Sequence, residues 1–222
     1  MEAQTSPALG FATKLLERIL LPAVDAVITV CETLAHRFRQ SGKKCRVLLT
    51  ARTRREVESL IFRPRAEVRR ELGFSPDDVV VGFVGNLQHK RLEMLIEAVE
   101  FVHQHDSDSR LKVLILGGPT KVREALATRA AASDAAARFV FHPIVDYRQV
   151  HHYLQVLDIG IIQYNRVLWA HLAIPQKIID YLACGVPVLT RNFRERARLV
   201  RASGAGLVFK GGEPYQVGEA LL

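Results

Sequence analysis

The chain has 222 residues, 49% of them hydrophobic and 24% charged, with a formal net charge of +8 at pH 7. These values predict a folded, soluble protein with enough apolar side chains for one full α/β domain and a smaller piece. No apolar run approaches the roughly 20 residues that cross a bilayer, and the N-terminus lacks the basic start of a signal peptide. The sequence therefore predicts neither a membrane span nor an exported chain.

Cysteine and histidine patterns bear on compartment and metal binding. Three widely spaced cysteines are present, at Cys31, Cys45 and Cys184. An odd number without a Cys-x-x-Cys pair favours buried, reduced thiols in a cytoplasmic protein. His151 and His152 are adjacent, so on a helix they would point about 100° apart, and no carboxylate has the spacing of a metal ligand relative to them. The sequence predicts no metal site.

Positive charge is concentrated in one region. Residues 37–70 carry twelve lysines and arginines against three glutamates, while the remainder of the chain is nearly balanced. Such a block favours contact with an anion, such as the lipid head groups on the inner face of a membrane, although a solvated basic surface explains it equally well. Aromatic residues do not alternate with the charges and no nucleic-acid motif is present, so nucleic acid is not a predicted partner.

Short, β-branched apolar runs alternate with helical stretches, which is typical of a parallel sheet with crossover helices. The predicted strands are residues 26–30, 46–50, 79–85, 111–118, 138–142, 157–164, 186–190 and 206–210. Helices are predicted at residues 92–103, 121–131, 148–156, 176–184 and 195–202. The last six strands predict a complete doubly wound, Rossmann-like α/β sheet.

A domain boundary is predicted between residues 64 and 65. Arg63-Pro64 requires an extended backbone, the charge pattern changes, and a new series of strands and helices begins after Pro76. The part before the boundary offers two strands and two helices, too few to close a sheet, and is interpreted as the end of another domain. Because the sequence also ends within an amphipathic stretch, VGEALL, both ends are interpreted as truncated.

Ligands of doubly wound sheets bind at the carboxyl ends of the strands, where loops lead into helices. One such corner, GNLQHKR, combines Gly85, which lets the backbone approach a ligand, with Lys90, which is able to reach a diphosphate. Another, LGGPTK, places Gly117 and Gly118 where they either open space for a ligand or only form the turn. Neither corner contains a Walker or dinucleotide-binding motif.

A third corner, AIPQKIIDYLACGVPVLT, places a lysine in the first turn of a predicted helix. Pro175 suits the first helical position and Gly185 the position past the end, so Lys177 lies near the positive end of the helix dipole, which disfavours a cation. A bound phosphate would satisfy the lysine and the free backbone N–H groups together. Asp180 is able to accept hydrogen bonds from ribose hydroxyls, or else forms a surface ion pair with Lys177. The predicted buried face is Ile178, Ile179, Leu182 and Ala183.

Five segments, in this order and spacing, resemble the family 4 retaining glycosyltransferases of GT-B architecture: AVITVCETLAHRF, VVVGFVGNLQHKRLEMLIEAVE, LKVLILGGP, VDYRQVHHYLQVLDIGIIQY and IPQKIIDYLACGVPVL. The last is the most specific, being similar to the family pattern Pro-x-Lys-x-x-Glu-Tyr-x-Ala-x-Gly-x-Pro-Val. The resemblance covers nearly the whole chain from about Ala23 onward. It implies that residues 65–222 are the nucleotide-sugar (donor) binding domain and that residues 1–64 are the end of the acceptor domain and the interdomain crossing.

The resemblance also implies an activity and roles for single residues. Lys90 matches the basic residue set against the donor diphosphate, Lys177 the lysine of the Pro-x-Lys pattern, and Asp180 a Glu that usually contacts the ribose. Such enzymes transfer a hexose from a UDP-, GDP- or ADP-activated donor to a glycan or lipid-linked acceptor, with retention and generally without a bound metal. No cofactor is therefore expected, and basic groups would stabilise the departing diphosphate.

The sequence departs from the family pattern at several positions. Asn86 replaces an arginine that often follows the turn glycine, Leu172 replaces the first Glu of a pair, and Asp180 is one methylene shorter than the second. The Asn-Gly of the interdomain crossing is absent from LLTARTRREV, and most of the acceptor half is missing. Because catalysis in this architecture takes place between two domains, the chain alone is expected to lack part of its cleft.

The predicted function is a truncated glycosyltransferase of polysaccharide or glycolipid synthesis, cytoplasmic or peripheral to the membrane. One alternative is a non-catalytic subunit that binds nucleotide sugar and needs a second polypeptide to complete the cleft. Another is a nucleotide-sugar epimerase, which shares the architecture but which the Pro-x-Lys segment disfavours.

Overall fold

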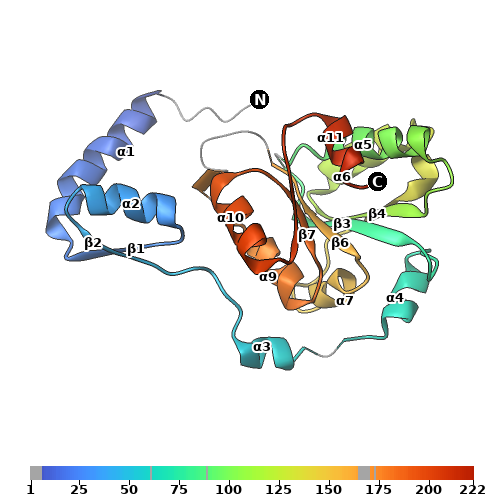
Figure 1. Cartoon of the computed structure of the whole chain (residues 1–222), viewed down its shortest axis with the longest axis horizontal. Helices are drawn as coiled ribbons and strands as arrows, with labels where there is room; N and C mark the ends of the chain where they lie inside the picture. The colour runs from blue at the N-terminus through green and yellow to red at the C-terminus, as the bar shows by residue number, and fades with distance from the viewer. Residues whose placement is uncertain (1–6, 61, 89, 165–170, 173) are drawn as a thin grey trace. The chain divides into compact units, whose positions relative to one another are not determined.

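The computed structural model describes residues 7–60, 62–88, 90–164, 171–172 and 174–222 (Figure 1). Its contacts divide the chain into two compact units, which we call unit 1 (Met1–Leu49) and unit 2 (Thr50–Leu222). The sequence predicts a boundary between residues 64 and 65, where the end of an acceptor domain meets the donor domain. That boundary stays a prediction.

Unit 1, in its described residues, contains the two strands and two helices that the sequence predicts. The elements are α1 (Pro7–Leu20), the 3-10 turn η1 (Leu21–Ala23), β1 (Ala26–Thr29), α2 (Glu32–Gln40) and β2 (Lys44–Val47). The strands pair in parallel with Ala26 opposite Lys44, so β2 begins earlier than the predicted 46–50. The reason is the turn at Gly42, whose φ of 79° returns the chain to β1 directly after α2.

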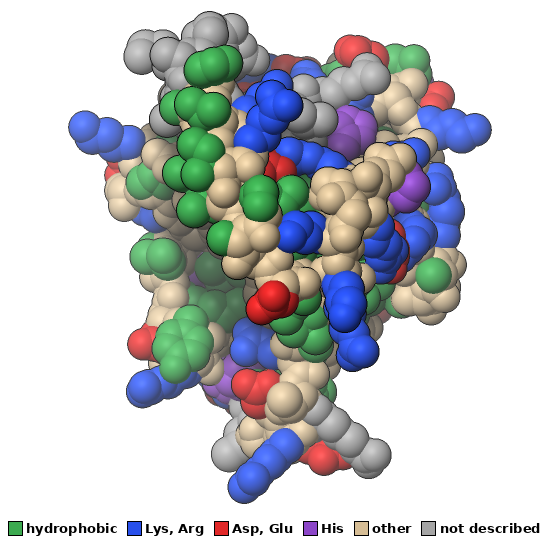
Figure 2. Space-filling model, turned by 90° about the vertical axis from the view of Figure 1, so that its left-hand side faces the viewer, with side chains coloured by type: hydrophobic (Ala, Val, Ile, Leu, Met, Phe, Trp, Pro, Cys, Tyr) green, Lys and Arg blue, Asp and Glu red, His purple; other side chains and the backbone are tan. Residues whose placement is uncertain are grey.

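Helix α1 exposes an apolar row. Phe11, Leu15, Leu16 and Ile19 are 48% to 70% exposed, and Figure 2 shows hydrophobic side chains in a row beside lysine and arginine side chains. A two-stranded sheet is too small to bury every apolar side chain of its helices. In the described part of the chain, no helix combines the length and the hydrophobicity needed to cross a membrane.

Unit 2 holds the parallel sheet that the sequence predicts. Its strands are β3 (Val79–Asn86), β4 (Leu111–Gly118), β5 (Phe139–His142), β6 (Ile159–Ile162), β7 (Val188–Arg191) and β8 (Gly206–Phe209). Its helical elements are α3 (Arg54–Glu58), α4 (Arg65–Glu71), α5 (Leu92–His105), α6 (Thr120–Ala131), η2 (Ala136–Arg138), α7 (Val150–Leu154), α9 (Gln176–Ala183), α10 (Arg194–Ser203) and α11 (Pro214–Glu219). The strand order is β5-β4-β3-β6-β7-β8, and it reverses between β3 and β6. At such a switch point, doubly wound sheets bind ligands outside the carboxyl ends of the strands.

Helices cover both faces of this sheet, as Figure 1 shows, because successive strand residues point to opposite sides. Val81 points into a core that includes Leu95 of α5, with α6 and α11 on the same face. Its neighbour Val80 points into a second core, which includes Ile178 of α9 and side chains of α4, α7 and α10. The doubly wound α/β fold predicted from the sequence is thus confirmed.

Two predicted elements are each four residues shorter in the structure, the largest differences from the predicted bounds. The helix predicted over 148–156 is α7, which begins only at Val150, because the Asp146 carboxylate accepts the backbone N–H of Arg148 at 2.8 Å and holds the chain in a turn. The strand predicted over 157–164 is β6, which begins at Ile159. Asp158 precedes it and bonds to Val80 twice: its backbone N–H donates to the carbonyl of Val80 at 2.8 Å, and its carboxylate accepts the backbone N–H of Val80 at 2.8 Å.

The side chain of Tyr181 attaches α9 to β3 near the switch point of the sheet. The ladder between β3 and β6 joins only Val81 and Gly82 to their partners in the described residues. Beyond this short ladder, the hydroxyl of the fully buried Tyr181 makes two hydrogen bonds to the backbone of β3. It donates to the carbonyl of Gly82 (3.2 Å) and accepts the N–H of Val84 (3.0 Å). Gly160 of β6 makes room, because a Cβ there would lie 2.6 Å from the tyrosine ring. Tyr181 thereby holds the first turn of α9 against the end of β3.

The predicted buried face of α9 needs correction. Ile178 is fully buried, as expected, but Ile179, Leu182 and Ala183 are only half-buried, and Tyr181 takes the central place in the core. A tyrosine is accepted there because its hydroxyl reaches two backbone groups of β3.

The basic region of residues 37–70 is partly neutralised by the fold. In the described part of this region, ion pairs join Arg37 to Glu17, Arg39 to Glu32, Arg52 to Asp180, Arg63 to Glu67 and Glu71, and both Arg65 and Arg69 to Asp158. Most of these carboxylates come from outside the region. The net positive charge around residues 37–70 is therefore smaller in the folded protein than the sequence alone suggests. The argument that this region binds an anionic membrane is correspondingly weaker.

Candidate functional site

Basic side chains from separate elements meet at the carboxyl ends of β3 and β6. Lys90 follows β3, Lys177 lies in the first turn of α9, and Arg196 lies in the first turn of α10. The Nζ of Lys90 and the Cζ of Arg196 lie 4.3 Å and 4.6 Å from the ring centroid of Tyr164, which follows β6. We call Lys90, Lys177 and Arg196 the cationic cluster.

Lys177 is the most deeply placed ammonium group of the cluster. Its Nζ is buried 3.7 Å from the ring centroid of Phe83, and no hydrogen-bond partner for it exists among the described residues. Gly85 leaves it space, since a Cβ there would approach Nζ to 3.4 Å. Helix α9 begins at Gln176, as the predicted range 176–184 has it, with Pro175 as its N-cap instead of its first helical residue, and Lys177 lies in the first turn as expected. An aromatic face replaces only part of the hydration that a buried ammonium loses.

The electrostatics of the cluster are unfavourable without an anion. Burial, together with the smaller effects of the charges of Lys90 and Arg196 and against the opposing charge of Asp180, lowers the pKa of Lys177 to about 7. Burial also lowers the pKa of Arg196 to about 10, and burial followed by the charge of Arg196 lowers the pKa of Lys90. Perturbed pKa values from burial and like charges, at a switch point, are typical of a ligand site. The ligand that would relieve them is an anion.

Asp180 pairs with Arg52. The Nη2 and Nε of Arg52 lie 2.9 Å and 3.0 Å from its Oδ1, which also accepts the amide N–H of Gln176 at 3.2 Å. An ion pair between Asp180 and Lys177, one of the two predicted alternatives, is not formed among the described residues. The other alternative, contact with a ribose, stays a prediction.

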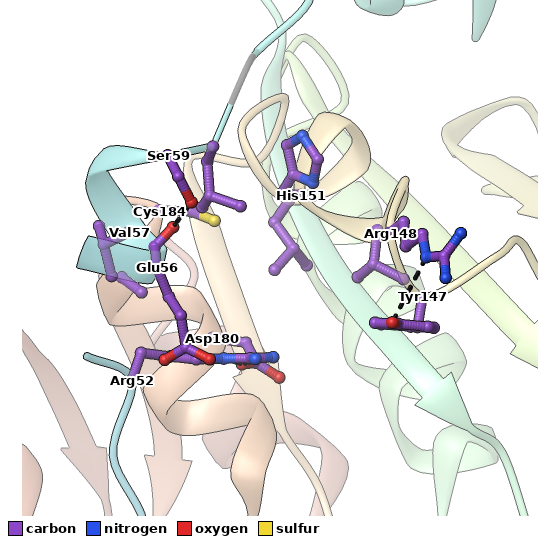
Figure 3. Close-up of a pocket in the computed structure, with 13 residues that line it drawn as sticks. Arg52, Glu56, Val57, Ser59, Tyr147, Arg148, His151, Asp180 and Cys184 are labelled. Carbon is purple, nitrogen blue, oxygen red and sulfur yellow. Dashed lines mark hydrogen bonds and ion pairs between the residues drawn. The ribbon is translucent and has the colours of Figure 1, made fainter. Parts of the chain in front are cut away.

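A pocket of about 470 Å³ lies between α3, α7 and α9. Figure 3 shows Arg52 and Asp180 together at one end of it, with Arg148 and His151 on the opposite wall. Its remaining lining is largely apolar, including Leu154 of α7. This half-open pocket lies next to Asp180, the carboxylate for which the family resemblance implies contact with a ribose.

The other predicted site residues surround the end of β3. Asn86 is exposed, and its Oδ1 accepts the backbone N–H of Gln88 at 2.8 Å, so it shapes the turn before Lys90. Gly117 lies opposite Gly85 in the β3–β4 register, and a Cβ there would lie 1.8 Å from the carbonyl oxygen of Gly85. The sequence left open whether Gly117 makes space for a ligand or only forms the turn, and the geometry adds a third reason for a glycine, the close approach of β3 and β4. Gly118 has open space, with the nearest atom 3.9 Å from such a Cβ.

Sequence reasoning missed Arg196. It lies in a segment, RNFRERARLV, whose dense charge is typical of a solvated helix face. In the structure Arg196 is 0% exposed, with its Cζ 4.2 Å from the ring centroid of Phe193 as well as near Tyr164. Phe193 is only three residues away in sequence, but Tyr164 reaches the arginine through the tertiary fold, so the local pattern alone does not report the burial.

Comparison with known proteins agrees with this geometry. Residues 78–222 match the family model described as glycosyl transferases group 1. Curated relatives include the D-inositol 3-phosphate glycosyltransferases of Nocardia farcinica (29% identity, 72% of this chain, 36% of the relative) and Rhodococcus jostii (30% identity, 68% of this chain, 34% of the relative). The chain thus spans about a third of the length of these relatives.

Solved structures show the same fold. Anabaena Alr3699/HepE in complex with UDP and glucose has a TM-score of 0.73 at 16% identity, over 94% of this chain and 55% of that one. The glycosyltransferase WaaG, involved in lipopolysaccharide biosynthesis, has a TM-score of 0.64 at 15% identity, over 87% of this chain and 52% of that one. These neighbours have the GT-B architecture that the sequence motifs indicated. The chain belongs to the glycosyl transferases group 1 family.

Proposed function

We propose that unit 2 binds the diphosphate of a nucleotide sugar at the cationic cluster. The observation that carries this proposal is the buried Nζ of Lys177, which has no hydrogen-bond acceptor in the described part of the chain and lies near two further cations. A diphosphate supplies the missing acceptors and the compensating charge. Lys90 and Gly85 would then meet the same group from the β3 side, and Asp180 would contact the ribose after release from Arg52.

The names of the related proteins support this proposal. Alr3699/HepE has been solved with UDP and with UDP-glucose, so a protein of this fold holds such a donor. The curated relatives are named for transfer of a glycosyl group to D-inositol 3-phosphate. The Pro-x-Lys segment around Lys177 is the part of this sequence that most resembles the family pattern.

The proposed reaction is transfer of a hexose from the nucleotide sugar to a glycan or lipid-linked acceptor, with retention of configuration. The chemical contribution of this chain is stabilisation of the diphosphate as the bond to the sugar breaks, since the cluster places basic side chains together where that negative charge develops. Acceptor binding belongs, by the family resemblance, to the other half of the enzyme. The full cleft therefore requires residues beyond those of unit 2.

Calorimetric titration of the purified chain tests the donor site without requiring turnover. UDP, GDP, ADP and their glucose or mannose conjugates are titrated, with the free nucleosides as matched ligands that lack phosphate. We expect saturable binding for one base, and binding of the corresponding nucleoside at least tenfold weaker, because the cluster contacts phosphate. Equal affinity for nucleoside and diphosphate would show that the cluster is not the phosphate site, and no binding at all would reject the proposed function.

A further inference from the structure

The surroundings of Lys177 bear on how a ligand would enter the site. Its Nζ is buried beside the face of Phe83 of β3, and a Cβ at Gly85 would lie 3.4 Å from it. Among the described residues, the charged groups that face it from other elements are Lys90, from the β3–α5 loop, and Arg196, from α10. Both are positive, so neither stabilises the charged form of the lysine.

The acidic group on the same helix gives only partial compensation. Asp180 favours the charged form of Lys177, but its Oδ1 is already bonded to Arg52 and Gln176. The phenol of Tyr164 adds no negative charge, because burial raises its pKa above the usual value although Arg196 opposes the shift. Lys177 of the empty site therefore has a pKa near neutrality, about 7, instead of the ordinary 10.5.

We propose that, above neutral pH, Lys177 takes up a proton from solvent when a nucleotide diphosphate binds, so that the lysine becomes fully charged in the complex. This inference rests on the proposed function. The diphosphate brings negative charge next to Nζ, which favours the ammonium form, and the lysine then donates hydrogen bonds to the phosphate oxygens. One N–H bond forms, at Nζ, and the proton comes from water or buffer.

The affinity for a nucleotide diphosphate is expected to fall as the pH rises. Above about pH 7 the free site holds Lys177 mostly neutral, so each binding event must take up a proton, and the apparent affinity falls by up to about tenfold per pH unit. Below about pH 6 the lysine is already charged, and affinity becomes independent of pH. A site built from ordinary surface lysines would show neither change in this range.

The test is calorimetric titration of the full chain in Tris and in HEPES at pH 8, two buffers with different heats of ionisation. The probes are UDP-glucose, GDP-mannose and ADP-glucose, whose diphosphate diesters do not titrate near this pH. For the probe that binds, we expect wild type to take up most of one proton, and its affinity to fall between pH 6 and pH 9.

Two variants separate the outcomes. Lys177→Arg keeps a permanent charge and is expected to bind without proton uptake, whereas Lys177→Met keeps the side-chain length and is expected to bind weakly with no pH dependence. Failure of every probe to bind wild type rejects the proposed function itself. Binding to wild type without proton uptake, or uptake that persists in Lys177→Met, leaves the donor site intact but overturns the role given to Lys177.

Discussion

Replacing Lys177 with alanine is expected to weaken nucleotide-diphosphate binding by about 10- to 100-fold. The variant removes the one buried ammonium that the described fold leaves without an acceptor, and hydrogen bonds to charged groups contribute about 1.5–3 kcal/mol. The free energy of unfolding should change by less than about 1 kcal/mol, because lost packing of the aliphatic stem is offset by removal of a buried amine that has no hydrogen-bond partner in the described residues. Titration and urea unfolding measure the two quantities.

Lys210→Ala is the matched control, since it removes an exposed lysine that follows β8 at the edge of the sheet. Its affinity should equal that of wild type. If Lys177→Ala unfolds the protein, or if both variants lose affinity equally, the buried lysine is a structural group or one charge among many, and the cluster is not a specific anion site.

Gly117→Ala is expected to cause a large loss of stability, of at least about 3 kcal/mol. The residue has a φ of 148°, which side-chain-bearing residues rarely adopt, and its new Cβ would lie 1.8 Å from the carbonyl oxygen of Gly85. The two strands would have to separate where β3 ends and the site begins. Urea unfolding measures the change.

Gly118→Ala, one residue further, serves as its control. Its φ is not in the left-handed region and the nearest atom to the new Cβ is 3.9 Å away, so the loss should be below about 1 kcal/mol. If the two variants unfold at the same urea concentration, the close approach of β3 and β4 at Gly117 does not contribute to stability.

The sheet was predictable because its signal is local. In β4 the apolar run coincides with the strand, Leu111–Gly118, and β3 extends the prediction of 79–85 by one residue, since both strands are central and buried on both faces. Residues 148 and 149 were assigned wrongly to a helix, because a side-chain turn at Asp146 competes with helix formation there.

The site was only partly predictable, because its energetics arise between distant residues. Lys90 could be selected from its position after a strand and Lys177 from its position in the first turn of a helix, but the burial of Arg196 depends partly on the ring of Tyr164, which comes from another segment. The pair between Arg52 and Asp180 joins residues 128 positions apart, which no spacing rule detects. The neutralisation of the basic region has the same cause, since most of its partner carboxylates lie elsewhere in the sequence.

The most direct measurement is a crystal structure of the chain with bound UDP-glucose, or with whichever nucleotide sugar the titrations select. We predict that the diphosphate lies outside the carboxyl ends of β3 and β6, with an oxygen within about 3 Å of the Lys177 Nζ. A nucleotide bound with its phosphates in solvent, remote from Lys177 and Lys90, would contradict the assignment of the cationic cluster as the donor diphosphate site.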